Sequence, residues 1–263
     1  MSTMRKIAAG LSVCMFAVMA LAGCGGNQAA SGGSGSGAKT LKVGSTIDFA
    51  PFEFQDEKQK DYQGFDMDLI RAIGKEMGYT VEISNIGFDG LIPALQAKNI
   101  DVIISGMTIT EERKGKVAFS DPYYQSGLTM VVREDNPDIK TFKDLEGKKI
   151  AVQIGTTSAE EVKKIKNAEV KELNTPADCF MELKAGGADA VVNDRPVNDY
   201  YITQSGATGV KALTERLTAE DYGIAISKEN EQLQKEINGA LKKLKENGEY
   251  EKIFQKWFGT EKK

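Results

Sequence analysis

Apolar positions along residues 39–263 recur in two patterns, one typical of helices and one typical of buried strands. Phe65 to Met77 carry an apolar side chain at every fourth residue and are followed by Gly78, which predicts a helix closed by a glycine. Val102 to Ile104 form a continuous apolar run, as in strands covered on both faces. The same reasoning predicts strands at 41–45, 79–83, 148–153 and 188–192, and helices around 91–95, 162–165, 176–185, from 196, at 233–244 and at 250–258. This alternation indicates an α/β protein.

Two segments echo each other. LQAKNIDVIISGMT places Asp101 six residues after Leu95, and LKAGGADAVVNDRP places Asp189 six residues after Leu183. Each segment starts as the end of a helix and enters an apolar strand that small polar residues follow. Two lobes of similar βαβ design would explain the echo, with a ligand site beyond the carboxyl ends of the strands, in a cleft between the lobes.

The first 38 residues are predicted to direct targeting rather than folding. Arg5 and Lys6 precede an apolar run that ends at Ala22, and this run is shorter than the roughly 20 residues of a membrane-spanning helix, so residues 1–23 are expected to be a signal peptide. The tetrad ending at Cys24 resembles a bacterial lipobox, in which this cysteine is lipidated and becomes the first mature residue. The alternative is a plain signal peptide that is cut nearby. Residues 24–38 would then be the lipidated cysteine and a flexible Gly/Ser tether.

Composition excludes several classes of function. The chain has no His, so catalytic groups and metal sites that depend on imidazole are impossible, and no metal or cofactor is expected. With 34 Lys and Arg against 38 Asp and Glu, it has no basic excess for nucleic acid. Loss of Arg5 and Lys6 with the signal peptide takes the net charge from −4 to −6. Cys179 would be the single cysteine left in the folded part, so no intrachain disulfide can form.

Arg113 is a candidate ligand-binding residue because of its place at a predicted helix start. The segment from Ser105 leaves the buried strand, Thr110 is a plausible N-cap, and Arg113 follows at the third helical position. A positive charge there opposes the helix dipole by about 0.3–1 kcal/mol. An arginine beside free N–H groups suits a carboxylate ligand, with the alternative that Arg113 pairs with Glu111, Glu112 or a neighbouring acid.

The second half of the chain offers a comparable set of groups. Gly155 permits a tight turn after a strand, and the hydroxyl residues at 156–158 are candidate caps that either offer backbone donors to an anion or merely cap a helix. Asp194 precedes Pro196 and either caps the next helix or faces the cleft as the counter-charge of an ammonium group. Four phenylalanines are either core residues or pocket walls: Phe49, Phe52, Phe54 and Phe88. A cleft with these groups suits a zwitterion such as an amino acid.

Eight stretches of the chain together resemble a known family. They are DFAPFEF, YQGFDMDLIRAIGKEMG, GFDGLIPALQAKNIDVIISGMTITEERK, VAFSDPYYQSGL, KDLEGKKIAVQIGTTS, ADAVVNDRP, YGIAISKENEQL and YEKIFQKWFG. The pattern is similar to that of bacterial amino-acid-binding proteins of ABC importers, the polar amino acid group of the type 2 periplasmic binding fold. The resemblance runs from about Leu41 to Gly259, and glutamine-binding members look most similar.

The resemblance implies a role for individual residues. Arg113 is expected to hold the ligand carboxylate with the backbone amides of Thr108 and Thr157. The ligand ammonium is expected to meet Asp194, the carbonyl of Gly106 and the hydroxyl of Thr108. Phe49 and Phe88 would enclose the side chain. The complete set of expected ligand-binding residues is Thr46, Asp48, Phe49, Phe88, Ser105, Gly106, Met107, Thr108, Arg113, Gln153, Thr156, Thr157, Asn193 and Asp194.

The chain departs from the family pattern around the ligand side chain. Thr46 stands where glutamine and basic-amino-acid binders often have an aspartate. Gln153 and Asn193 stand where the glutamine type has a lysine and a histidine. The groups left are neutral and hydrogen-bonding, which favours an uncharged polar ligand, glutamine first, over arginine or lysine. Asp48 decides this preference, because an inward-pointing Asp48 would supply the acid that a basic ligand needs.

The resemblance also implies two lobes, each with a mainly parallel sheet flanked by helices, and a two-strand hinge. Ligand binding between the lobes would close them, and the closed form would deliver the amino acid to an ABC transporter permease. The protein is expected to act as a monomer, lipid-anchored at the outer face of the bacterial cytoplasmic membrane. An enzyme resembling cyclohexadienyl dehydratase, with Glu53 or Asp48 as general acid, is the alternative from another class. The expected boundaries are 39–122 plus 223–263 for lobe 1, 123–127 and 218–222 for the hinge, and 128–217 for lobe 2.

Overall fold

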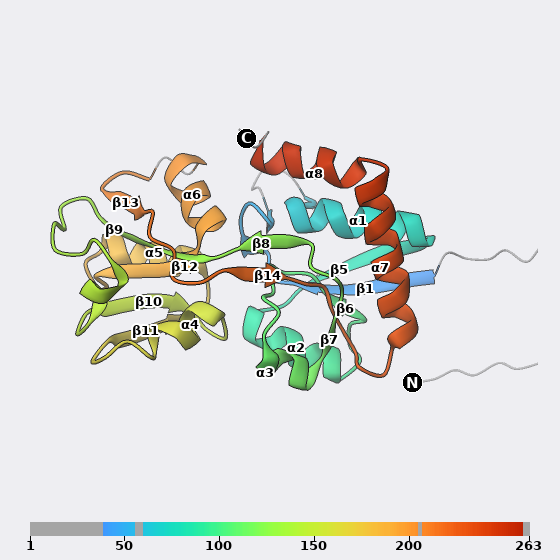
Figure 1. Cartoon of the computed structure of the whole chain (residues 1–263), viewed down its shortest axis with the longest axis horizontal. Coiled ribbons are helices and arrows are strands. Elements are labelled where there is room, and N and C mark those ends of the chain that lie inside the picture. Colours follow the sequence, from blue (N-terminus) through green and yellow to red (C-terminus); the bar gives the residue numbers. More distant parts are fainter. Residues whose placement is uncertain (1–38, 56–59, 205–206, 260–263) are drawn as a thin grey trace, which may run out of the picture. The chain divides into compact units, whose positions relative to one another are not determined.

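The computed structural model describes residues 39–55, 60–204 and 207–259 (Figure 1). The signal peptide, Cys24 and the tether, all predicted from the sequence, lie outside the described residues. The described part contains two five-stranded sheets with helices packed against them, which confirms the α/β prediction.

The first sheet has the strand order β5 (Tyr79–Asn85), β1 (Lys39–Ser45), β6 (Val102–Ile103), β15 (Ala225–Ile226) and β7 (Ala118–Phe119). β1 pairs in parallel with β5 and β6, whereas β15 pairs antiparallel with β6 and β7. The helices that belong to this part of the chain are α1 (Phe65–Met77), α2 (Phe88–Gln96), α3 (Glu111–Lys116), α7 (Glu231–Glu246) and α8 (Glu249–Phe258).

Gly78 closes α1 as the sequence pattern predicts. Its φ of 74° lies in the left-handed region, and its N–H donates to the carbonyls of Gly74 and Lys75. The apolar face of α1 packs into a core that it shares with α7, so the fourth-residue spacing corresponds to real burial.

The second sheet has the order β11 (Glu169–Leu173), β10 (Lys149–Gln153), β12 (Ala190–Asp194), β9 (Leu128–Arg133) and β13 (Val210–Leu213). β10 pairs in parallel with β11 and β12, and β9 pairs antiparallel with β12 and β13. It is accompanied by a short 3₁₀ helix (Phe142–Leu145), α4 (Thr157–Val162), α5 (Pro176–Lys184) and α6 (Arg195–Gln204).

Two predicted helix boundaries are wrong by a few residues. α4 ends at Val162, so Ile165 lies beyond it in a turn in which its N–H donates to the Val162 carbonyl. α6 starts at Arg195, one residue before Pro196. Both differences lie at helix ends, where hydrophobic spacing carries little information.

The internal echo is confirmed by equivalent backbone contacts. A carboxylate oxygen of Asp101 accepts from the Lys42 N–H at 2.9 Å, and the Asp101 N–H donates to the Lys42 carbonyl at 2.8 Å. Asp189 and Lys149 form the same pair of bonds, at 2.9 and 2.7 Å. Each aspartate therefore joins the turn before one parallel strand to a lysine of the neighbouring strand, β1 or β10.

β8 (Tyr124–Ser126) and β14 (Glu220–Tyr222) form a separate antiparallel pair, which runs between the two sheets in Figure 1. A small three-stranded sheet of β2 (Asp48–Phe49), β3 (Glu53–Gln55) and β4 (Tyr62–Gln63) follows β1. The lobe and hinge boundaries given above remain a prediction.

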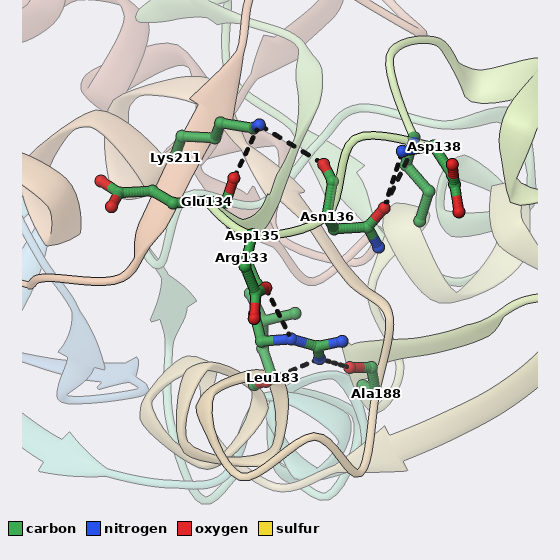
Figure 2. Close-up of polar contacts among 9 residues, drawn as sticks. Arg133, Glu134, Asp135, Asn136, Asp138, Leu183, Ala188 and Lys211 are labelled. Carbon is green, nitrogen blue, oxygen red and sulfur yellow. Dashed lines mark hydrogen bonds and ion pairs between the residues drawn. The ribbon is translucent and has the colours of Figure 1, made fainter.

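Polar contacts fix the end of β9 in the second sheet (Figure 2). The Arg133 guanidinium donates to the carbonyls of Leu183 and Ala188 at 3.2 and 2.9 Å. The Lys211 ammonium donates to two carbonyls of the 134–136 turn, at 3.3 and 3.4 Å. These cations therefore tie the end of β9 to the end of α5 and hold the 134–136 turn.

The described residues include no helix that is long and apolar enough to cross a membrane. Within the same residues, no group of three or more His, Cys, Asp or Glu side chains is arranged to hold a metal ion. Cys179 is buried in α5, and burial raises the pKa of its thiol to about 12. This thiol therefore behaves as a packing group.

Candidate ligand-binding pocket

A pocket lies where the carboxyl ends of β6, β10 and β12 meet the starts of α2, α3 and α4. Ten of the fourteen residues expected from the sequence line it, and the other four, Thr46, Asp48, Met107 and Asn193, do not. Of these four, Asp48 is half-buried and the others are buried. The lining residues are Phe49, Phe88, Ser105, Gly106, Thr108, Arg113, Gln153, Thr156, Thr157 and Asp194.

Arg113 is positioned by the cap of α3. The Thr110 hydroxyl accepts from the Arg113 N–H at 3.1 Å, which confirms the predicted N-cap. The guanidinium donates to the carbonyls of Thr108 and Gly155 at 2.8 and 3.1 Å and lies 5.3 Å from the ring centre of Phe88. It is therefore held across the pocket by groups from both halves of the chain.

The hypothesis that Arg113 pairs with Glu111 or Glu112 is wrong. Glu111 pairs with Lys114 at 2.8 Å, and Glu112 pairs with Lys116 at 2.7 Å. Arg113 forms no ion pair with any described residue, although its side chain is buried with 5% of the residue exposed. Burial lowers the pKa of the guanidinium, but an arginine remains charged. Glu160, Glu220 and Asp194 act on this cation only through space, so the guanidinium can form a direct pair with an anionic ligand group.

The turn from β10 into α4 faces Arg113. Thr156 caps α4, because its hydroxyl accepts from the Ala159 N–H at 3.3 Å and donates to the Gln153 carbonyl at 2.7 Å. Gly155 has a φ of 76°, and a Cβ placed on it would lie 3.1 Å from the Cβ of Asp89 in α2. Glycine therefore lets this turn approach α2 closely. The amide of Thr157, the first residue of α4, has no acceptor inside the helix.

Asp194 lies at the end of β12 and binds the strand pair instead of capping α6. Its Oδ1 accepts from the Ser126 hydroxyl at 2.7 Å and from the Tyr222 hydroxyl at 2.5 Å. Burial, followed by the nearby charge of Glu220, raises the pKa of Asp194 to about 7. Asp194 has no ion pair in the described part of the chain, so an ammonium group would stabilise its charged form.

Asp48 lies beside Thr46 and Gln153. These two side chains lower its pKa, but burial dominates and raises it to about 6. Asp48 Oδ1 is buried and has no hydrogen-bond partner among the described residues, and the same is true of Gln153 Oε1. One hydrogen of the Gln153 amide nitrogen is donated to the Asn174 carbonyl at 3.0 Å. Gln153, which lines the pocket, and Asp48, whose side chain interacts with it, therefore each present an acceptor without a partner in the described part of the chain.

The aromatic residues divide between pocket and core. Phe49 and Phe88 line the pocket, and Phe49 packs so closely on Gly106 that a Cβ there would lie 2.9 Å from its ring. Phe52 is fully buried in the core. Phe54 packs against Tyr200 and Trp257, with ring centres 5.9 and 5.7 Å away. The site that the sequence resemblance implies therefore uses two of the four candidates.

Glu220 is a residue near the pocket that sequence reasoning missed. Its Oε2 accepts from the hydroxyls of Thr108 and Thr157 at 2.6 and 3.0 Å. The sequence carried no local signal for it, because the burial of Glu220 and Tyr222 on one face of β14 follows from pairing with β8, far away in the sequence.

Two buried acids, Glu53 and Asp66, lie beneath the loop that follows β6. Sequence reasoning missed Asp66 and considered Glu53 only as a general acid. Glu53 accepts from the Ser105 hydroxyl at 2.9 Å, and Asp66 accepts from the Gly106 N–H at 2.8 Å and the Tyr123 hydroxyl at 2.7 Å. Burial raises the pKa of both carboxyl groups. Glu53 is fully buried and does not line the pocket, so it is poorly placed to act as the general acid that a dehydratase needs.

Two α/β units, a connecting strand pair and a pocket at the strand ends define a ligand-binding protein of the type 2 periplasmic binding class. The chain belongs to the bacterial extracellular solute-binding proteins, family 3, which it matches over residues 41–260. This result confirms the resemblance derived from the sequence. Several of its relatives are named as amino-acid-binding proteins.

Three proteins similar to this chain are named by the ligand they bind or by the enzyme they preceded. The arginine-binding extracellular protein of Bacillus subtilis (strain 168) is 35% identical over 248 residues, which cover 92% of this chain and 94% of that protein. An ancestral arginine-binding protein, 48% identical, has been solved with arginine (TM-score 0.81) and with glutamine (TM-score 0.79), each covering 84% of this chain and 98% of that one. An ancestral amino-acid-binding precursor of cyclohexadienyl dehydratase is 43% identical, with a TM-score of 0.77 and coverages of 83% and 95%.

Proposed function

We propose that the protein captures a basic L-amino acid, arginine first, and delivers it to an ABC importer. Arg113 would bind the ligand carboxylate and Asp194 its ammonium. The observation that carries the choice of ligand is the pair of buried, unpartnered acceptors, Asp48 Oδ1 and Gln153 Oε1. A guanidinium group has five N–H donors in a planar arrangement and suits two adjacent acceptors.

This proposal changes the preference for glutamine that the sequence favoured. That preference depended on the absence of an acid near the ligand side chain, and Asp48 lies beside Gln153, which lines the pocket. Charge supports the change, because Asp48, Asp194 and Glu220 outnumber the single cation Arg113. A ligand with one positive charge in excess reduces this imbalance.

Glutamine remains the second candidate. A similar ancestral arginine-binding protein has been solved with glutamine bound. The glutamine amide can donate to the same acceptors, but it leaves the charge of Asp48 without a partner. Arginine is therefore expected to bind more tightly than glutamine.

Calorimetric titration of the purified protein, freed of bound ligand, with all twenty amino acids tests the proposal. We expect arginine to bind most tightly, with glutamine weaker by about 1.4 kcal/mol or more, a factor of ten. Tighter binding of glutamine would overturn the choice of arginine. Absence of binding to any amino acid would overturn the proposed site.

The remaining proposals concern location and partners. We propose that the signal peptide ends at residue 23 and that a lipid on Cys24 holds the protein at the outer face of the cytoplasmic membrane. There it would act as a monomer and meet the permease. The family consists of extracellular proteins, which supports an extracytoplasmic location. The LAGC tetrad and the Gly/Ser segment after it support the anchor.

The substitution Cys24→Ser tests the anchor. It removes the thiol that would carry the lipid, so we expect the protein to leave the membrane fraction or to remain as an unprocessed precursor. Fractionation and gel mobility measure both outcomes, with Cys179→Ser as a control that leaves the tetrad intact. Unchanged membrane attachment and mobility of the Cys24→Ser protein would contradict lipidation.

A further inference from the structure

Glu220 is a buried acid next to the pocket that forms no direct ion pair with the described residues. Only 6% of the residue is exposed, and its carboxylate accepts from three hydroxyl groups, those of Thr108, Thr157 and Thr218, at 2.6, 3.0 and 3.0 Å. It forms no ion pair with any residue of the described ranges. A buried carboxylate that has no direct ion pair, with Arg113 acting on it only through space, is costly, which favours a functional reason for its presence.

The hydroxyl groups of Thr108 and Thr157 each donate their only hydrogen bond to Glu220. A threonine hydroxyl has one donor hydrogen and two acceptor lone pairs, whereas a carboxylate only accepts. The hydrogens of Thr108 Oγ1 and Thr157 Oγ1 are therefore both directed at Glu220 Oε2. Toward a ligand in the pocket, these oxygens can act only as acceptors.

Asp194, which lines the same pocket, also presents an acceptor to a ligand. Asp194 Oδ1 receives hydrogens from Ser126 and Tyr222 and has no hydrogen to give when it is charged. Thr108 and Asp194 line the same pocket, and the backbone of Thr108 pairs with Tyr222, whose hydroxyl donates to Asp194. A ligand group that meets several acceptors needs several donor hydrogens.

We infer that Glu220 is a positioning residue that makes the pocket selective for an α-ammonium group over an α-hydroxyl group. This inference rests on the proposed function, since it concerns the same pocket. An ammonium group brings three hydrogens and a positive charge, whereas a hydroxyl brings one hydrogen and no charge. Glu220 acts through Thr108, whose hydroxyl it turns into an obligatory acceptor. The ligand class is therefore α-amino acids, with α-hydroxy acids that carry the same side chain rejected.

The test compares L-arginine with the α-hydroxy acid of the same side chain, by calorimetry, in the wild-type protein and in Glu220→Gln. Glutamine at this position keeps the shape but removes the charge and replaces one carboxylate oxygen with an NH₂ donor. With the NH₂ in the position of Oε2, the hydroxyls of Thr108 and Thr157 both turn their hydrogens away from residue 220. We expect the ratio of the two affinities to fall by about tenfold. A ratio equal to that of the wild type would overturn the inference.

Two controls separate this role from a structural one. Asp221→Asn removes one charge from the exposed face of the same strand and is expected to leave the ratio unchanged. Thr108→Val removes the hydroxyl that Glu220 orients, so Glu220→Gln added to Thr108→Val should lower the ratio no further. A further fall in the double variant would show that Glu220 does not act through Thr108 and would overturn the inference.

The outcomes distinguish the inference from the proposed function. Wild-type protein that binds no amino acid contradicts both, whereas wild-type binding with an unchanged ratio in Glu220→Gln contradicts the inference alone. Melting of the ligand-free variants checks that they fold. If Glu220→Gln does not fold, Thr108→Val alone decides, since a wild-type ratio in that variant overturns the inference.

Discussion

Arg113→Ala is expected to abolish binding of every L-amino acid. The guanidinium is buried, carries no ion pair in the described residues and lies beside the free amide of Thr157. It is therefore the group best placed to bind a carboxylate that all amino acids share. Loss of a buried charge-assisted pair costs about 2–5 kcal/mol, so calorimetry should show affinity at least about thirtyfold lower.

Stability of the ligand-free protein distinguishes binding from a structural role of Arg113. Its two hydrogen bonds to the carbonyls of Thr108 and Gly155 are lost in the variant, but so is an uncompensated buried charge. We therefore expect only a small change in melting temperature. Arg195→Ala is the control, because Arg195 is exposed and pairs with Asp199 at 3.2 Å. Full binding by Arg113→Ala, or a loss of several kcal/mol in its ligand-free stability, would contradict the assignment.

Asp48→Asn is expected to remove the preference for a basic ligand. The substitution keeps the size of the side chain and replaces its charge with a neutral amide, so the guanidinium loses its counterion. We expect L-arginine to bind at least about thirtyfold more weakly and L-glutamine to change little, measured by calorimetry. Asp135→Asn is a matched control, since Asp135 is largely exposed at the far end of the second sheet (Figure 2). Equal losses for both ligands would contradict a contact between Asp48 and the ligand side chain.

The same acid predicts a pH dependence. Burial raises the pKa of Asp48 to about 6, so protonation removes its charge as the pH falls through that value. Arginine affinity should then fall by up to about tenfold per pH unit below about pH 6. The pKa of Asp194 is raised to about 7, so protonation of Asp194 on acidification weakens the binding of all amino acids alike. The ratio of arginine to glutamine affinity isolates Asp48 and should be flat with pH in Asp48→Asn.

The pocket residues that could be predicted from the sequence follow strands with strong local patterns. Thr156 and Asp194 follow β10 and β12, two neighbouring parallel strands of the second sheet, so strand geometry brings them to one edge. Arg113 follows β6 of the first sheet, and its place was predicted from its position at a helix start. The family resemblance supplied their individual roles. What spacing could not decide was the partner of Arg113, because Glu111 and Glu112 have equally close lysines that the structure shows they prefer.

Asp48 and Glu220 show why the rest could not be predicted. The alternation that relates Thr46 to Asp48 is interrupted, because β1 ends at Ser45 and β2 starts at Asp48. The direction of Asp48 therefore depends on packing from the second half of the chain. Glu220 lies in a three-residue strand that pairs with Ser126, far away in sequence. No local pattern specifies such a pairing.

The strand order of the first sheet has a consequence for the order in which the chain folds. β15, at residues 225–226, lies between β6 and β7, so the middle of this sheet stays open until the last part of the chain is present. The second sheet uses strands from Leu128 to Leu213 alone. During synthesis from the N-terminus, the middle of the chain can therefore complete its sheet first, and the segment made earliest must wait for the segment made last.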